Sequence, residues 1–377
     1  MKLENPFPEY GYFGPEYFCD REQETEELIN ALVNGSNVTL MAPRRIGKTG
    51  LISHAFERMK ANDKNVRCFY VDIFSTKTFN QMVQFIANAV IGKLDSPSQS
   101  VMRKLNGFVS ALRPTVSQDP ITGMPTFSVS VTSERARDTL QQVFEYMKES
   151  GRQCYLAIDE FQQVSRYAEI GADAFIRSII QFVPNVHVIF SGSQQHLLAD
   201  MFMSPEHPFF NSTQIMTIGT INANAYRAFA NRFFARQKRE MSEEAFIYLY
   251  DMVDGQTWYV QKILNRLYRT PKGKLDQEDV FRATDKILHE QEINYQSNYN
   301  LLTDNQAQLL TAIACEGRVN APTSLDFILR HQLPAPSSIK MALKSLQDKE
   351  FLFYDVKQGY MVYDRFFGMW LKRLAGL

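Results

Sequence analysis

The sequence has no excess of charge of either sign, and it has few cysteines and histidines. Its 377 residues include 41 basic and 41 acidic side chains, so the formal net charge is zero. Without an overall basic bias, any contact with nucleic acid has to come from a local patch. The four cysteines are far apart and form no Cys-x-x-Cys pair, which predicts reduced core residues instead of a disulfide framework. The six histidines never stand at metal-ligand spacing, so we expect no zinc site.

Long apolar runs are missing as well. No stretch approaches the ~18 apolar residues of a membrane span, and the start "MKLENPFPEY" lacks the apolar core of a secretion signal. The sequence contains neither repeats nor a low-complexity tract. We therefore expect a cytoplasmic globular protein without membrane contact, and its length is sufficient for two or three domains with separate cores.

Short apolar runs alternate with helical patterns over the first part of the chain. Near-continuous apolar strands separated by helices predict a parallel sheet that is covered on both faces. The five candidate strands are residues 37–42, 66–73, 154–159, 187–192 and 213–219. A different segment, residues 113–134, alternates polar and apolar residues around "DPITG". This alternation predicts a β-hairpin inserted between the second and third strands of the sheet.

After residue 220 the apolar residues recur at helical spacing only. The last part of the chain then shows three helical patterns followed by two short strands, which is the pattern of a winged helix. The three helices are expected at 304–316, 323–330 and 336–349, and the strands at 351–356 and 359–364. The resulting domain prediction is an α/β domain over 1–219, a helical lid over 220–298 and a winged helix over 299–377.

The stretch "VTLMAPRRIGKTGLI", residues 38–52, predicts a buried strand, a turn and the start of a helix. Gly47, Lys48 and Thr49 match the end of the pattern G-x-x-x-x-G-K-[ST], in which the lysine reaches the β and γ phosphates of a nucleotide and the hydroxyl binds Mg²⁺. Ala42 replaces the first glycine, and Pro43 would hold it in an extended conformation. A chance match is the alternative, but the strand before and the helix after the motif argue against it. The predicted ATP-binding residues are Ala42, Pro43, Arg44, Arg45, Ile46, Gly47, Lys48, Thr49 and Gly50.

Polar residues follow two further predicted strands. Asp159 and Glu160 end the apolar run "CYLAID", where the first could hold Mg²⁺ together with Thr49 and the second could polarise an attacking water. An ordinary acidic strand end is the alternative. Ser191 ends the run "HVIFS" and could touch the γ phosphate, although a turn made of small residues would look the same.

These motifs resemble the AAA+-like archaeal and bacterial ATPases of the STAND-related group, and the similarity covers nearly the whole chain. The segments that carry it are "YFCDREQETEELINALVNG" (entry box), "APRRIGKTGLI" (an Arg-Arg P-loop), "LAIDEFQQV" (Walker B), "VIFSGSQ" (sensor strand), "DGQTWYVQKIL" (start of the lid helix) and "YDRFFGMWLKR" (closing helix). The resemblance implies a five-stranded parallel sheet of the P-loop NTPase (ASCE/AAA+-like) class with strand order 5-1-4-3-2. It also implies that Tyr17, Phe18 and Arg21 contact adenine, although a solvated helix start is the alternative for Arg21. For Arg44 and Arg45, contacts to phosphate or another domain and simple solvation both remain open.

The chain departs from the family where arginines are usual. The segment after the sensor strand, "PFFNSTQI", contains no arginine, and "GQTWYVQ" lacks one as well. An arginine near the γ phosphate can raise the rate by about 10³–10⁵. We therefore expect slow hydrolysis by the isolated chain, with an arginine supplied by a protein partner or a second copy. Within the chain itself the first candidates are Arg45, Arg177 and Arg266.

The winged helix raises the question of DNA binding. Its candidate recognition helix offers Lys340 and Lys344, but over residues 301–377 basic residues outnumber acidic ones by only nine to seven. This small excess favours packing against the ATPase core or a protein partner over DNA binding. The function predicted is ATP binding and Mg²⁺-dependent hydrolysis, with Lys48 and Glu160 as catalytic residues and ATP or ADP controlling a slow switch. A nucleotide-gated DNA-binding or scaffold protein with negligible turnover is the alternative.

Overall fold

The computed structural model describes residues 3–91, 93–94, 113–118, 125–355 and 358–376, and for 113–118 and 125–129 it describes the backbone alone. The chain divides into two compact units. The first contains residues 1–226 together with 256–258, and the second contains 227–255 together with 259–377. In the described part of the chain, no helix is both long and apolar enough to cross a membrane.

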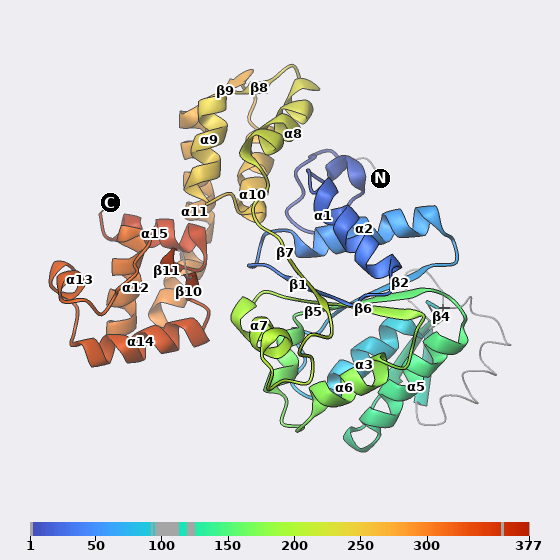
Figure 1. The fold of residues 1–377 in the computed structure, drawn as a ribbon. Coiled ribbons are helices and arrows are strands. Elements are labelled where there is room, and N and C mark those ends of the chain that lie inside the picture. Colours follow the sequence, from blue (N-terminus) through green and yellow to red (C-terminus); the bar gives the residue numbers. More distant parts are fainter. Residues whose placement is uncertain (1–2, 92, 95–112, 119–124, 356–357, 377) are drawn as a thin grey trace. The chain divides into compact units, whose positions relative to one another are not determined.

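The first unit is built around a five-stranded parallel sheet with the order β2-β5-β6-β1-β7 (Figure 1). The strands are β1 (Val38–Met41), β2 (Arg67–Asp72), β5 (Cys154–Asp159), β6 (Val186–Gly192) and β7 (Gln214–Thr217). Numbered along the chain, this order is the predicted 5-1-4-3-2, so the parallel sheet and its order are confirmed. Because all five strands run in the same direction, the ends of β1, β5 and β6 meet at one edge of the sheet.

Helices cover both faces of this sheet (Figure 1). One face packs against α1 and α2, and the other packs against α3, α5, α6 and α7, which produces two separate apolar cores. The bounds are α1 (Glu22–Val33), α2 (Lys48–Asn62), α3 (Phe79–Val90), α5 (Ala136–Glu149), α6 (Ala172–Ile180) and α7 (Gln195–Met203). Every residue of β1 and β5 is buried, as expected for strands between two helical layers, and this explains their largely apolar sequences, in which Thr39 and Asp159 are the polar residues.

Two strands lie outside this sheet, between α3 and α5. β3 (Arg113–Gln118) and β4 (Pro125–Ser130) pair antiparallel, with Arg113 opposite Ser130. The turn predicted at "DPITG" lies outside the described residues.

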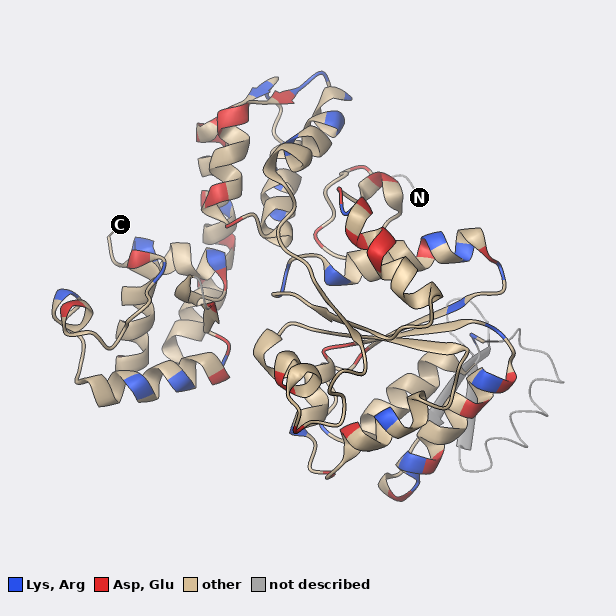
Figure 2. Ribbon diagram, viewed as in Figure 1, with Lys and Arg blue, Asp and Glu red and all other residues tan. Residues whose placement is uncertain are grey.

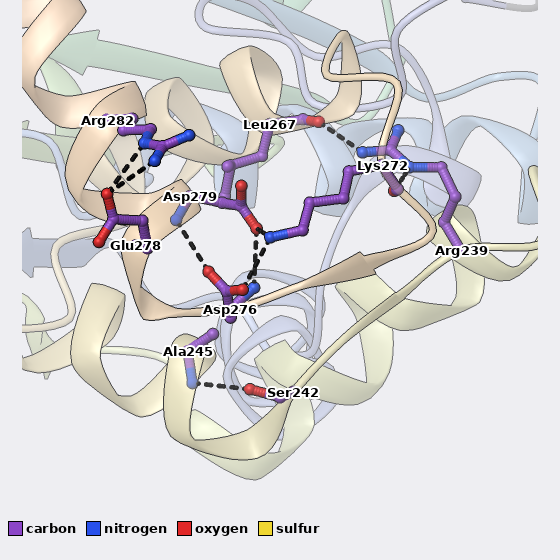
Figure 3. A network of polar contacts seen from close by, with 9 residues as sticks. All are labelled: Arg239, Ser242, Ala245, Leu267, Lys272, Asp276, Glu278, Asp279 and Arg282. Carbon is purple, nitrogen blue, oxygen red and sulfur yellow. Dashed lines mark hydrogen bonds and ion pairs between the residues drawn. The ribbon is translucent and has the colours of Figure 1, made fainter.

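The second unit begins with a group of helices. They are α8 (Ala223–Ala235, which starts in the first unit), α9 (Glu243–Met252), α10 (Thr257–Tyr268) and α11 (Gln277–Asn300), with the two-residue strands β8 (Glu240–Met241) and β9 (Lys274–Leu275). Figure 3 shows the hydrogen bonds and ion pairs around the N-terminus of α11. Asp276 and Asp279 form a capping box, and the Lys272 ammonium donates to both carboxylates at 2.7 Å. Arg239 donates to backbone carbonyls at the end of α10, including that of Leu267 at 2.8 Å.

The end of the chain forms three helices, a two-stranded antiparallel sheet and a closing helix. They are α12 (Asp304–Glu316), α13 (Leu325–Arg330), α14 (Pro336–Asp348), β10 (Leu352–Asp355), β11 (Gly359–Val362) and α15 (Arg365–Leu374). This arrangement confirms the predicted winged helix, although Lys357 in its wing lies outside the described residues. Asp254, in the turn before α10, forms ion pairs with the winged helix: its carboxylate accepts from Arg318 at 2.5 Å and from Arg365 at 3.0 Å.

Candidate active site

The loop between β1 and α2 has the backbone of an anion-binding turn. Gly47 has φ = 101°, a conformation that favours glycine, and Arg45 has φ = 66°. α2 begins at Lys48 directly after this turn. The first N–H groups of a helix have no partner within the helix, and the helix dipole adds positive potential there. The predicted phosphate cradle therefore has the local geometry that a phosphate needs.

Lys48 lies inside this loop. Its side chain is 7% exposed, and its ammonium donates to the Ala42 carbonyl at 3.1 Å and to the Pro43 carbonyl at 3.3 Å. Burial lowers the pKa of Lys48, whereas the nearby Asp159 and Glu160 carboxylates act in the opposite direction. The positive charge is thus held at the edge of the sheet, facing the acidic end of β5.

The Asp159 carboxylate is fixed by donors from several elements. Its Oδ1 accepts from the Ser191 hydroxyl at 2.6 Å and the Glu160 amide at 3.0 Å. Its Oδ2 accepts from the Tyr70 hydroxyl at 2.5 Å and lies 3.5 Å from the Thr49 hydroxyl. Burial, followed by the charge of Asp159, raises the pKa of Tyr70, so its phenol remains a proton donor.

The structure therefore brings the predicted metal ligands Thr49 and Asp159 together. A hydroxyl and a carboxylate fit Mg²⁺, which is bound by oxygen atoms and commonly takes one or two carboxylates in addition to substrate phosphates. Ser191 is fully buried and is used to orient Asp159. Its predicted contact with the γ phosphate remains a prediction.

Glu160, the predicted base, follows in a left-handed conformation with φ = 57°. Such backbone strain in a residue other than glycine is concentrated at functional sites. Its Oε2 accepts from the Ser193 hydroxyl at 2.8 Å, the Ser193 backbone N–H at 3.3 Å and the Gln162 side-chain Nε2 at 2.5 Å. Arg44 in the P-loop donates to the same Ser193 hydroxyl at 3.2 Å and lies over the Phe74 ring at 5.0 Å. The acidic end of β5 is thus linked to the end of β6 and to the P-loop.

The segment before α1 supports the P-loop from another side. Arg21 is 3% exposed, and its guanidinium donates to the carbonyls of Ile46 at 3.0 Å and Gly219 at 2.7 Å. A solvated helix start, the alternative considered for Arg21, is therefore wrong, because its charged group is buried against backbone.

The aromatic residues of this segment lie close to the start of α2. The Phe18 ring stacks on His54 at 4.4 Å and would lie 3.4 Å from a Cβ atom at Gly50. Tyr17 is buried, and its hydroxyl accepts from the Leu3 amide at 2.9 Å. Adenine contacts of Tyr17, Phe18 and Arg21 remain predictions.

The start of α10 also contacts the P-loop. The Thr257 hydroxyl donates to the Ile46 carbonyl at 2.9 Å, and the Trp258 amide donates to the Arg45 carbonyl at 3.0 Å. The Arg45 guanidinium lies 4.4 Å from the centre of the Trp258 ring, a cation–π geometry. Arg44 and Arg45 thus both have protein contacts, and simple solvation is wrong for them.

Several residues of this site were not recognised as site residues in the sequence, among them Tyr70, Phe74, Gln162, Thr257 and Trp258. No local sequence signal marks Tyr70, because the strand order places β2 beside β5 with Asp72 opposite Asp159 but does not say which side chain of β2 reaches the carboxylate. Of the other candidate arginines, Arg266 forms an ion pair with Glu290 inside the second unit, and Arg177 is exposed on α6.

Comparison with known proteins agrees with this geometry. An uncharacterized ATP-binding protein of Methanocaldococcus jannaschii is 28% identical over 161 residues, which cover 39% of this chain and 43% of that protein. The chain thus matches less than half of the length of this relative.

Solved structures show the same fold at low sequence identity. A Walker-type ATPase of Pyrococcus abyssi superposes with a TM-score of 0.66 at 16% identity, covering 97% of this chain and 99% of the other. The Aeropyrum pernix ORC2 protein, in ADPNP–ADP complexes, gives a TM-score of 0.59 at 15% identity, with coverage of 100% and 97%. The ORC1 protein of the same organism gives 0.53 at 13% identity, with coverage of 99% and 95%.

Family models account for most of the chain. Residues 293–373 match a model described as a probable winged helix domain. Residues 18–263, which include every residue of the site described above except Tyr17 and Leu3, match the model of an ATPase domain found predominantly in Archaea. The chain therefore belongs to this family of predominantly archaeal ATPase domains, and a winged helix domain follows its ATPase domain.

Proposed function

We propose that this protein binds ATP with Mg²⁺ at the edge formed by β1, β5 and β6, and hydrolyses it slowly as a nucleotide-dependent switch. The observation that carries the proposal is the convergence of four side chains there. Lys48 and Thr49 come from the start of α2, and Asp159 and Glu160 come from the end of β5. Membership in an ATPase family supports the same ligand.

Each of these residues has a defined task in the proposal. Lys48 would leave the carbonyls of its own loop and bind the β and γ phosphate oxygens. Thr49 and Asp159 would hold Mg²⁺, which neutralises charge on the phosphates when bound. Glu160 would orient a water and accept its proton at Oε1, because three donors already occupy Oε2.

The proposed slow rate follows because the two arginines of the P-loop already contact protein groups. Arg44 contacts Ser193 and Phe74, and Arg45 lies over Trp258. Charge that spreads over the γ phosphate would be balanced by Lys48 and Mg²⁺, and an arginine from a protein partner or a second copy would add the missing factor of about 10³–10⁵. A long-lived ATP state suits a switch, in which ATP or ADP controls the helical lid and the winged helix.

A second candidate is a nucleotide-gated DNA-binding or scaffold protein with negligible turnover. The observation in its favour is that Lys340 and Lys344 are exposed and lie one turn apart on α14, which carries basic residues in Figure 2. The ORC1 structure of Aeropyrum pernix was solved in complex with DNA. Asp348 continues the same helix face one turn later and weakens this second candidate. Multiple-turnover phosphate release separates the two candidates, since only the ATPase produces it.

The test of the cradle is Lys48→Ala, measured by calorimetric titration with ATP and Mg²⁺. The change removes the proposed hydrogen bonds from the ammonium to the phosphate oxygens. Hydrogen bonds to charged groups contribute about 1.5–3 kcal/mol each, so we expect the affinity for ATP to fall by at least about tenfold. Lys60→Ala is the matched control, because Lys60 is an exposed lysine in the last turn of the same helix. Equal ATP affinity of the Lys48 variant and the parent would show that the loop is not the phosphate site.

A further inference from the structure

Tyr70 lies beside the two predicted metal ligands without being one of them. Its hydroxyl is 2.5 Å from Asp159 Oδ2 and 3.3 Å from Thr49 Oγ1, and these last two atoms are 3.5 Å apart. The three oxygen atoms form a triangle whose corners come from β2, α2 and β5. Tyr70 itself is half-buried and packs against the apolar core that contains residues of α1 and α2.

The protons of this triangle can be counted. The carboxylate of Asp159 has none, so the phenol must be the donor in the 2.5 Å contact. The Thr49 hydroxyl has one proton, which the Tyr70 oxygen or the Asp159 carboxylate can accept. A hydroxyl that binds a cation must use its lone pair for the cation and turn its proton away. The phenol therefore does two things at once: it fixes one oxygen of Asp159 and offers an acceptor for the Thr49 proton.

We propose that Tyr70 is a positioning residue for the Mg²⁺ that accompanies the nucleotide, acting through Thr49 and Asp159. This inference rests on the proposed function, because it needs an ATP site with a divalent cation. Groups that hydrogen-bond to metal ligands orient those ligands, and their loss typically costs about 10–100-fold in metal affinity. Tyr70 is the residue whose side chain reaches both ligands from a third element. Phenylalanine at this position would keep the ring and remove both hydrogen-bonding roles.

The experiment compares the parent with Tyr70→Phe in calorimetric titrations with AMPPNP, a non-hydrolysable ATP analogue, in EDTA and again at the lowest Mg²⁺ concentration that saturates the parent. The measured quantity is the gain in nucleotide affinity on adding Mg²⁺, which does not depend on turnover. We expect equal affinities in EDTA and a gain for the variant that is at least about tenfold smaller. Tyr167→Phe is the matched control. Its hydroxyl is also hydrogen-bonded, to Thr76 at 2.6 Å in the same unit, so its loss should leave the gain unchanged.

The possible results separate the inference from the function on which it rests. If the parent binds the nucleotide in neither condition, the proposed function is wrong, and the inference falls with it. If the parent gains affinity with Mg²⁺ and Tyr70→Phe gains as much, the inference alone is refuted. A variant that loses affinity in EDTA to the same degree as in Mg²⁺ would also refute it, because the phenol would then support the loop and not the metal. Rescue of the binding gain by raising the Mg²⁺ concentration tenfold would support it.

Discussion

Replacement of Arg21 by alanine is expected to weaken the ATPase domain at the base of its phosphate loop. The guanidinium is buried at 3% exposure and donates to two carbonyls, those of Ile46 in the loop and Gly219 after β7. It also forms an ion pair with Glu24, which is 31% exposed. Alanine removes all three contacts and leaves the two carbonyls without their donor.

The magnitude follows from the burial of these groups. A hydrogen bond from a charged donor contributes about 1.5–3 kcal/mol, and a buried polar group that loses its partner costs about 1–3 kcal/mol. Water can enter the space left by the guanidinium and satisfy part of this loss. We therefore expect the free energy of unfolding to fall by about 2–4 kcal/mol. In a unit of this size such a change lowers the unfolding midpoint by about 5–15 °C.

Thermal unfolding followed by circular dichroism measures this change. The transition of the first unit is identified by its shift on adding ATP and Mg²⁺, since a ligand stabilises the state that binds it. Arg58→Ala is the matched control. Its ion pair with Glu26 joins α1 to α2, but the side chains are 37% and 53% exposed, so the expected loss is at most about 1 kcal/mol. Equal midpoints for the Arg21 and Arg58 variants would refute the reasoning, because burial would then make no difference.

Three further predictions test the site and the winged helix. Glu160→Gln should keep ATP affinity and slow phosphate release by about 10²-fold or more, since an amide cannot accept the proton; parental turnover would exclude Glu160 as the base. Gly192→Ala would place a Cβ atom 2.0 Å from the Gln162 side-chain oxygen, and we expect a loss of about 1–3 kcal/mol in thermal unfolding; an unchanged midpoint would contradict this overlap. Lys340→Glu combined with Lys344→Glu should weaken DNA binding and reduce its salt dependence if α14 faces phosphate. No DNA binding by the parent would favour a protein contact for this helix.

The elements that carry a local pattern could be predicted from the sequence. The loop predicted to bind phosphate is a continuous stretch from Ala42 to Gly50, and the roles proposed for its glycine, lysine and threonine follow from their positions along the chain. The buried strands were recognisable because a strand between two helical layers is apolar throughout. The helices of the winged helix were recognisable because their apolar residues recur at helical spacing. The strand order came from the resemblance to a family and agrees with the structure.

The contacts that complete the site were decided by the tertiary structure alone. Tyr70 is 89 residues from Asp159, Arg21 is 198 residues from Gly219, and Thr257 is 211 residues from Ile46. A sequence pattern reports which face of an element is apolar, but it does not report which strand ends become neighbours. The two contacts of the Tyr70 hydroxyl exist because β2 lies beside β5, so that the phenol reaches the start of α2 as well as Asp159. For Arg21 the sequence left an adenine contact and a solvated helix start open, and the side chain is buried because the phosphate loop and the segment after β7 present carbonyl groups to it.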